Sequence, residues 1–208
     1  MANQITHVVL TDKVFDKYFQ GRYKRDFFIG TLFPDIRKRA NIDRRLTHQC
    51  EGDISTITMI KDDFQAGLCF HDFLDKVRER FIEKSGIYEK FKEYRFSVLG
   101  IKAAEDEVFY NKCNEWQEIS SYLDEVIPAE LETGIAEKII RHWHQLLQQY
   151  FKKAPTNETG MLLLRGIGFS EEQINEIKKE ILLIKDDKQV REVAEKLYNN
   201  IENIIDRY

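Results

Sequence analysis

The chain has 208 residues, a length that suits one domain and is ample to bury a hydrophobic core. Hydrophobic residues make up 42% and charged residues 33% of it, which is typical of a globular protein and not of a disordered one. The formal net charge of −4 provides no overall basic field that would recruit nucleic acid. Only three prolines and ten glycines occur, and this scarcity of helix breakers predicts long helices.

The amino-terminal stretch has no basic region followed by an apolar run, so we expect no signal peptide. No window approaches eighteen uninterrupted apolar residues, so we expect no transmembrane segment. The cysteines Cys50, Cys69 and Cys113 are odd in number and lack zinc-type spacing, which predicts reduced thiols. Together these features predict a cytoplasmic protein.

The first third of the chain predicts short helices around a basic loop. Apolar residues at three- and four-residue steps favour a helix over residues 4–20. A second apolar stretch, residues 23–33, stops at Pro34, because the residue before a proline avoids the helical conformation. Residues 34–46 form a densely basic loop. Residues 54–60 could form a strand by propensity, but no partner strand is evident nearby, and we favour a helix.

Longer helices are predicted in the middle of the chain. The strongest periodicity covers residues 64–83, and further helices are expected over residues 88–96 and 97–126. Pro128 marks a break, after which residues 129–151 predict another helix.

Residues 152–160 are polar and rich in helix breakers, which makes them the best candidate for a linker. After the linker, Ser170 and Gln173 have the spacing of a capping box at the start of a helix. Two amphipathic helices are expected beyond this point, over residues 171–184 and 188–207.

The predicted fold is therefore all-α, a single multi-helix bundle domain with a C-terminal helical pair. Residues 1–154 would form the main helical domain, and residues 161–208 would pack on it within the same domain or as a small appendage. The last helix carries a continuous apolar stripe that would pack either on the main body or on a second copy, forming a homodimer.

The most informative pair of residues is His71 and Asp75, four positions apart in the predicted helix 64–83. This spacing puts both side chains on one helix face, where an imidazole and a carboxylate can bind one divalent cation. Three residues upstream, His7, Asp35 and His48, are of the types needed to complete such a site. A buried carboxylate is costly unless it is paired or bound to metal, and Asp35 and Asp75 both stand beside apolar residues.

The order of these residues resembles that of a known family. The chain contains Thr6-His7, then Phe28-Ile-Gly-Thr-Leu-Phe-Pro-Asp-Ile36, Thr47-His48, and Phe64-Gln-Ala-Gly-Leu-Cys-Phe-His-Asp-Phe-Leu-Asp75. This order is similar to that of the zinc-dependent phospholipase C family, which is related to the single-strand-specific zinc nucleases. The matched region covers roughly residues 4–80, and the Gly-x-x-x-His-x-x-x-Asp spacing is its most specific part.

The resemblance implies the phospholipase C type of helical bundle, with residues 1–154 as the metal-binding domain. It implies a first metal held by four residues, and a second metal that Asp75 bridges and His7 also touches. The four ligands of the first metal would be Asp35, His48, His71 and Asp75. Asp35 and Asp75 are also the candidate catalytic residues.

The chain departs from the family pattern in two places. Secreted members use a free mature amino terminus as a ligand, and here we expect no signal peptide to be cleaved. A further zinc in the family needs two more histidines and a His-x-x-x-Glu element. Only His142 and His144 remain, and the residues four positions beyond them are Leu146 and Gln148. One or two metals are therefore expected instead of three.

The expected cofactor is a divalent metal, zinc before others, although nitrogen and oxygen ligands also accept iron, manganese or nickel. Such a cation lowers the pKa of bound water and polarises a phosphoryl oxygen, which predicts a hydrolase acting on a small phosphorylated substrate. The basic loop lies between two candidate ligands in sequence, and its guanidinium groups are suited to binding phosphate. Its candidate substrate-binding residues are Arg37, Arg39, Arg44 and Arg45.

Two alternatives remain open from the sequence. The dyad His71-Asp72, with His48 upstream, fits an HD-type phosphohydrolase in which Asp106 or Asp124 would be the last ligand. Asp72 and Asp106 are thus additional candidate ligands or bases; the neighbouring Glu105 and Glu107 offer further carboxylates. The other alternative is a non-catalytic helical binding protein with a structural metal, which the motif-poor C-terminal half fits equally well.

Overall fold

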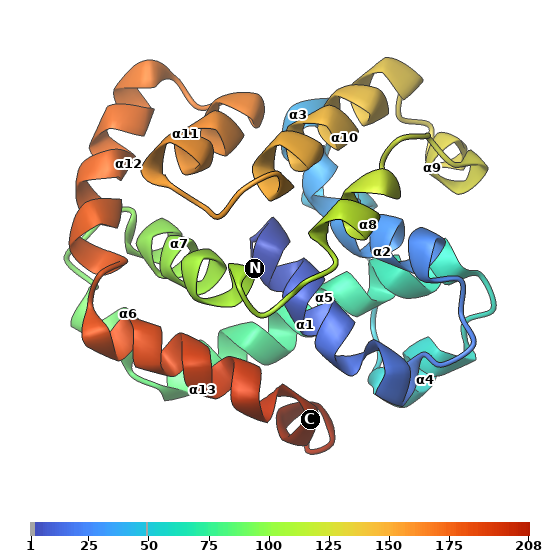
Figure 1. Cartoon of the computed structure of the whole chain (residues 1–208), viewed down its shortest axis with the longest axis horizontal. Coiled ribbons are helices and arrows are strands. Elements are labelled where there is room, and N and C mark those ends of the chain that lie inside the picture. Colours follow the sequence, from blue (N-terminus) through green and yellow to red (C-terminus); the bar gives the residue numbers. More distant parts are fainter. Residues whose placement is uncertain (1–2, 49) are drawn as a thin grey trace.

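Helices form all the regular secondary structure in residues 3–48 and 50–208, the part of the chain that the computed structural model describes. The predicted all-α class is confirmed (Figure 1). The elements in chain order are α1 (Gln4–Tyr18), α2 (Lys24–Leu32), η1 (Pro34–Ile36), α3 (Arg37–Ala40), η2 (Arg44–Leu46), α4 (Ile54–Met59), α5 (Asp63–Lys84), α6 (Ile87–Lys90), α7 (Ser97–Tyr110), α8 (Trp116–Ser121), α9 (Pro128–Glu132), α10 (Glu137–Phe151), α11 (Asn157–Gly166), α12 (Glu171–Ile184) and α13 (Lys188–Ile205).

The close crossing of α2 and α5 organises the first third of the chain. A Cβ atom added at Gly30 would lie 2.0 Å from the carbonyl oxygen of Phe64, and one added at Gly67 would lie 2.0 Å from that of Phe27. Glycine on both helices therefore lets the two backbones touch. The hydroxyl of Thr31 shares its proton between the carbonyl of Phe27 on its own helix, at 3.0 Å, and that of Gly67 across the crossing, at 3.3 Å.

A buried carboxylate ties α1 to α7 and α10. Asp106 Oδ1 accepts hydrogen bonds from the backbone nitrogen of Thr6, at 3.0 Å, and from its hydroxyl, at 2.8 Å. Asp106 Oδ2 accepts from the hydroxyl of Tyr150 at 2.6 Å. Burial raises the pKa of Asp106 to about 6, against the opposing effect of these donors. The amino-terminal turn of α1 is thereby fixed in the middle of the molecule (Figure 1).

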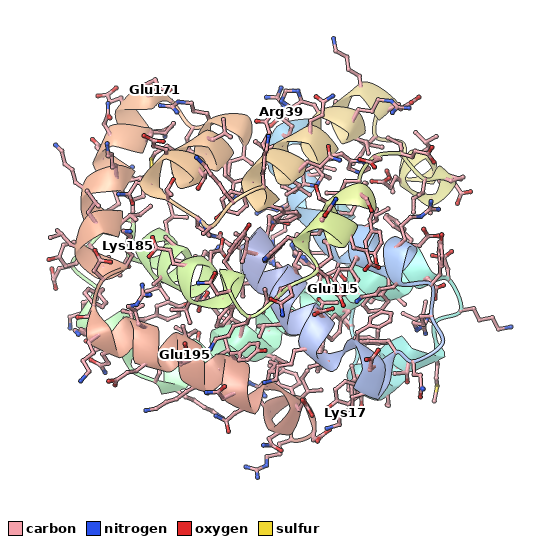
Figure 2. All side chains as sticks on the ribbon, viewed as in Figure 1. Lys17, Arg39, Glu115, Glu171, Lys185 and Glu195 are labelled. Carbon is pink, nitrogen blue, oxygen red and sulfur yellow. A yellow bond between two sulfur atoms is a disulfide. The ribbon has the colours of Figure 1, made fainter. Side chains whose placement is uncertain are left out.

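The C-terminal helices pack on the main body and share its core. Helix α12 lies against α7, and α13 lies against α7, α5 and α1. The apolar stripe of α13, including Val190, Leu197, Ile201 and Ile205, is buried within the same chain. Lys17 of α1 lies near the carboxyl end, with its Nζ 2.8 Å from Asp206 Oδ2 (Figure 2). The stripe is therefore not available for a homodimer.

The structure departs from the predicted elements at four places. The predicted helix 97–126 is two helices, because the chain turns after Tyr110, whose carbonyl accepts a hydrogen bond from the indole of Trp116. The predicted helix 129–151 is interrupted at Gly134, which has a φ of +79°. Only residues 88–90 of the predicted helix 88–96 are helical, as part of α6, and the basic loop contains η1, α3 and η2.

The capping box at Ser170 and Gln173 is confirmed, since the backbone nitrogen of each residue donates to the side chain of the other. The predicted linker is shorter than expected, because α11 begins at Asn157 behind its N-cap Thr156. Within residues 3–48 and 50–208, no helix combines the length and the apolar character needed to cross a bilayer.

We expect Gly67→Ala to destabilise the protein by about 3 kcal/mol or more, since its Cβ must push apart two backbones that cannot yield locally. The matched control is Gly160→Ala on α11, where an added Cβ meets no heavy atom within 4 Å and where alanine favours the helix. Denaturant unfolding measures both. Equal stability of the two variants would contradict the close crossing.

Candidate metal centre

Helix α5 supplies the central pair of the site. It begins behind Asp62, whose side chain accepts a hydrogen bond from the backbone of Gln65, and it continues for 22 residues. His71 lies one turn beyond Gly67, and Asp75 one further turn along the same face. The Nε2 atom of His71 is 3.7 Å from Asp75 Oδ2. Both side chains are almost fully buried, with exposures of 0% and 5%.

A backbone contact fixes the orientation of the His71 ring. Its Nδ1 lies 2.8 Å from the carbonyl oxygen of Thr31, which can only accept a hydrogen bond. Nδ1 therefore carries the proton and Nε2 presents a lone pair, the arrangement found in metal-ligating histidines. The same close crossing that places Gly67 against α2 thus selects the ligand atom of His71.

Helix α1 brings His7 onto this pair. The rings of His7 and His71 stack with their centroids 3.9 Å apart, and His7 Nε2 is 3.4 Å from Asp75 Oδ1. His7 is fully buried. Its position depends on the neighbouring Thr6, which Asp106 anchors.

The segment between α2 and α4 supplies the remaining two residues. Asp35 lies in η1, directly after Pro34, and its Oδ2 accepts a hydrogen bond from the side-chain amide of Gln4. His48 follows η2, and its ring lies edge-on to that of His71 with centroids 5.1 Å apart. The Nδ1 atom of His48 is 2.9 Å from the hydroxyl of Thr47, so Nε2 is the nitrogen left for a ligand.

The structure brings all five predicted ligands together in two overlapping groups. Ligand atoms of His7, Asp35 and His71 all lie within 4.8 Å of one another, and so do those of His48, His71 and Asp75. The resemblance implied a different division, in which Asp35 joins His48, His71 and Asp75, while His7 belongs to the second metal. His71 is common to both observed groups and forms the centre of the site.

Burial controls the charge of the site. Burial, together with His71 and Arg44, lowers the pKa of His48 to about 3, so its imidazole is neutral at pH 7. Burial and the neighbouring His7 lower the pKa of His71 in the same way. Burial raises the pKa of Asp75, but the contacts with His7 and His71 outweigh burial and leave this pKa well below its usual range. At pH 7 the site thus combines the neutral imidazole of His48 with the ionised carboxylate of Asp75.

The buried polar atoms fit a divalent cation. Within the described part of the chain, His7 Nδ1 and Nε2, His48 Nε2 and His71 Nε2 have no hydrogen-bond partner, although all are buried. Buried polar nitrogens without partners are rare in proteins, and each needs an explanation. A cation would engage the lone pairs of these imidazoles, and its two positive charges would balance the carboxylates of Asp35 and Asp75.

Two recesses reach the centre. A surface groove of about 590 Å³ is lined by His48, Asp72 and Asp75 together with Arg44. A separate, smaller cavity is lined by Asp35. Solvent and ligands can therefore approach different members of the same centre.

Asp72 lies outside both ligand groups. Its Oδ2 accepts a hydrogen bond from the backbone nitrogen of Cys50 at 3.0 Å, and its Oδ1 is 4.0 Å from His48 Nε2. Burial raises its pKa, in contrast to that of Asp75. Of the two aspartates after His71, the geometry favours Asp75 as the ligand.

Asp106 and Asp124, the acidic candidates later in the chain, form hydrogen bonds outside the centre. Both oxygens of Asp106 accept hydrogen bonds from Thr6 and Tyr150, and Asp124 accepts one from Gln148. Asp106 is therefore an anchor for α1 and not a ligand.

Glu105 and Glu107 are held in ion pairs. Glu105 forms a buried ion pair with Arg78, with 2.9 Å between Arg78 Nη2 and Glu105 Oε1. Glu107 pairs with Lys185 and Arg191.

The two histidines of α10 do not extend the centre. His142 is exposed. His144 is buried, with Nε2 2.8 Å from Glu130 Oε1 and Nδ1 3.1 Å from the carbonyl of Leu123. These contacts give His144 a structural role, and they leave no histidine for a third metal of the family type. Met1 and Ala2, which include the amino terminus, lie outside the described residues.

The predicted phosphate-binding arginines are dispersed. Arg44 is half-exposed at the groove, with Nη2 3.7 Å from Asp75 Oδ2. Arg45 is exposed and pairs with Asp43. Arg39 is exposed at the periphery, on α3 beside α10 (Figure 2). Arg37 is half-buried and lines neither recess.

Sequence reasoning missed Lys102, a buried cation of α7 that lines the cavity together with Asp35 and Lys38. A signal was present, since Lys102 is the only charged residue in the otherwise apolar run 98–104. An isolated charge on a buried helix face indicates a partner or a function.

The expectation of three reduced thiols was wrong for two cysteines. Cys50 and Cys69 form a disulfide, and only Cys113 is a free, buried thiol. The disulfide ties the segment that carries His48 to α5, two residues before His71.

Comparisons of the chain with protein-family models, curated proteins and solved structures found no match.

We expect Asp75→Asn to lower zinc affinity by at least about 100-fold, because a charged ligand is lost from the centre. Asp72→Asn should lower it by less than about tenfold, since Asp72 lies outside both ligand groups. Titration against a zinc-competing chromophore measures both affinities. A larger loss in Asp72→Asn would overturn the assignment of Asp75.

We expect the double variant Cys50→Ser, Cys69→Ser to lose about 3 kcal/mol of unfolding free energy, because a closed loop of this length constrains the unfolded chain. Zinc affinity should also fall, since the His48 segment is no longer tied to α5. Cys113→Ser, which breaks no cross-link, is the control for zinc affinity. Unchanged zinc affinity in the double variant would show that the disulfide does not position His48.

Proposed function

We propose that this protein is a metal-dependent phosphoester hydrolase of the zinc-dependent phospholipase C type, with its centre at His71. The observation that carries the proposal is the convergence of three imidazoles and two carboxylates, with unpartnered nitrogens, beside a groove that is open to solvent. Zinc is the first expected cation, and iron, manganese and nickel suit the same donors. The number of ions is one or two.

The residues have distinct roles in this proposal. When bound, the cation supplies a water of lowered pKa and polarises a phosphoryl oxygen. The contact with Thr31 holds the His71 ring, and Asp35 and Asp75 balance the positive charge. Arg44 is placed to form bidentate hydrogen bonds with a phosphate in the groove. Asp72 lines the same groove, and its buried Oδ1, 4.0 Å from His48 Nε2, is the candidate proton acceptor.

One observation favours a second function, a structural metal in a non-catalytic binding protein. His7 and His71 are both fully buried, as ligands of a closed structural site are. The HD-type alternative has less support, since Asp106 and Asp124 are both engaged elsewhere.

A cytoplasmic location stays a prediction, and the Cys50–Cys69 disulfide counts against it, because disulfides are rare in the cytosol. The proposal requires no homodimer.

Elemental analysis of protein purified without added metal, followed by a hydrolysis assay with bis-p-nitrophenyl phosphate, tests the proposal. We expect stoichiometric zinc and turnover, and both should be lost in His71→Ala. The matched control is His142→Ala, because His142 is an exposed histidine on α10. Stoichiometric zinc without turnover of mono- or diesters would support the structural reading, and protein that binds no metal would contradict both.

A further inference from the structure

A cavity of about 70 Å³ adjoins the metal centre and shares Asp35 with it. Its lining combines two kinds of residue. Gln4, Asp35 and Lys102 are among the polar ones, and Leu99, Leu163 and Ile181 are among the apolar ones that form its apolar wall. A partly open pocket lined mainly by apolar residues with a few polar groups is the usual form of a small-molecule site.

The burial of Lys102 is not explained by any hydrogen bond or ion pair within the described residues. Lys102 is only 6% exposed, and it forms no hydrogen bond or ion pair with any residue in the described ranges 3–48 and 50–208. A largely buried ammonium group is costly unless it meets a partner or solvent, and the side that Lys102 leaves open is the cavity. Burial and the nearby Arg78 lower its pKa, while Asp35 and Asp75 act in the opposite direction. Lys102 therefore stands beside the centre as a cation that an anionic ligand would satisfy.

The apolar wall is formed by distant parts of the sequence. Leu163 comes from α11 and Ile181 from α12, and both helices belong to the C-terminal part that contributes no metal ligand. Leu99 of α7, one turn before Lys102, lines the same cavity. The C-terminal helices thus add an apolar surface next to the centre.

We propose that this cavity binds the organic group of the substrate and that Lys102 receives one anionic phosphoryl oxygen from the cavity side of the centre, while Arg44 faces the phosphate from the groove side. The substrate class is then a phosphate ester of a compact, apolar alcohol. The assignment of the bound anion as a substrate rests on the proposed hydrolase function, whereas the binding site stands on the cavity and Lys102.

The size and surface of the cavity define this class. Its volume is about half that of an engineered cavity known to bind benzene, so it holds roughly three or four carbon atoms. A sugar or nucleoside would bring hydroxyl groups against Leu99, Leu163 and Ile181, where they would lose their hydrogen bonds to water. Larger organic groups would have to extend through its open side into solvent.

Calorimetry with two non-hydrolysable probes tests the proposal on zinc-loaded protein. Isobutylphosphonate carries the compact apolar group, and methylphosphonate presents the same anion almost without it. We expect isobutylphosphonate to bind at least roughly tenfold more tightly, because three additional carbons are buried. Equal affinities would overturn the proposal.

Two variants separate the polar and apolar contributions. Lys102→Met should weaken both probes at least about tenfold, with Lys179→Met, an exposed lysine on α12, as the control. Gly160→Leu places a side chain at the cavity wall where an added Cβ meets no heavy atom within 4 Å. It should remove the preference for isobutylphosphonate and leave methylphosphonate binding unchanged. A preference that survives Gly160→Leu, or full affinity in Lys102→Met, would overturn the assignment.

The outcomes distinguish this inference from the proposed function. A protein that prefers isobutylphosphonate, but hydrolyses no phosphoester, supports the binding site and contradicts the hydrolase. A protein that hydrolyses bis-p-nitrophenyl phosphate, but does not distinguish the two probes, supports the hydrolase and contradicts the cavity as its substrate site.

Discussion

The contact between the backbones of α2 and α5 is the constraint on which the candidate metal centre depends. Glycine at positions 30 and 67 lets the helices touch, and the touching surfaces place the Thr31 carbonyl against the ring of His71. That single acceptor fixes both the tautomer and the direction of the ring. Because α2 leads directly into η1, the same crossing also sets where Asp35 enters the site. Packing and ligand geometry therefore have one origin.

Electrostatics explains why so many polar side chains can be buried together. Fully buried imidazoles and carboxylates cost free energy in an apolar interior, and hydrogen bonds within the described residues satisfy only some of their atoms. Where a purely structural role exists, the partners are complete, as for Arg78 with Glu105 and for His144 with Glu130. The centre around His71 differs, because four of its imidazole nitrogens are buried and have no hydrogen-bond partner among the described residues. This contrast within one molecule distinguishes a ligand site from a buried ion pair.

The sequence predicted what depends on local spacing. Helix α5, the shared face of His71 and Asp75, and the capping box at Ser170 each follow from residues within a turn or two of one another. The roles of Lys102 and Asp106 could not be predicted in this way, because their surroundings come from α1, α10 and the C-terminal helices. The break after Tyr110 was likewise missed, since the Trp116 indole that satisfies its carbonyl lies in the next helix. The disulfide was missed because Cys50 and Cys69 meet only once the segment after η2 folds onto α5.

The anchoring of α1 has a consequence for how the molecule is assembled during synthesis. All five candidate ligands occur within the first 75 residues, yet the helix bearing His7 is held by Asp106, Tyr150 and, at its other end, Asp206. Contacts between residues so distant in sequence form late, because a long stretch of chain must first be brought together. A nascent chain of about 75 residues therefore contains all five candidate ligands but not the later residues whose contacts hold α1 in place. We therefore expect the proposed centre to bind a cation only after α7, α10 and α13 have been synthesised and have packed against α1.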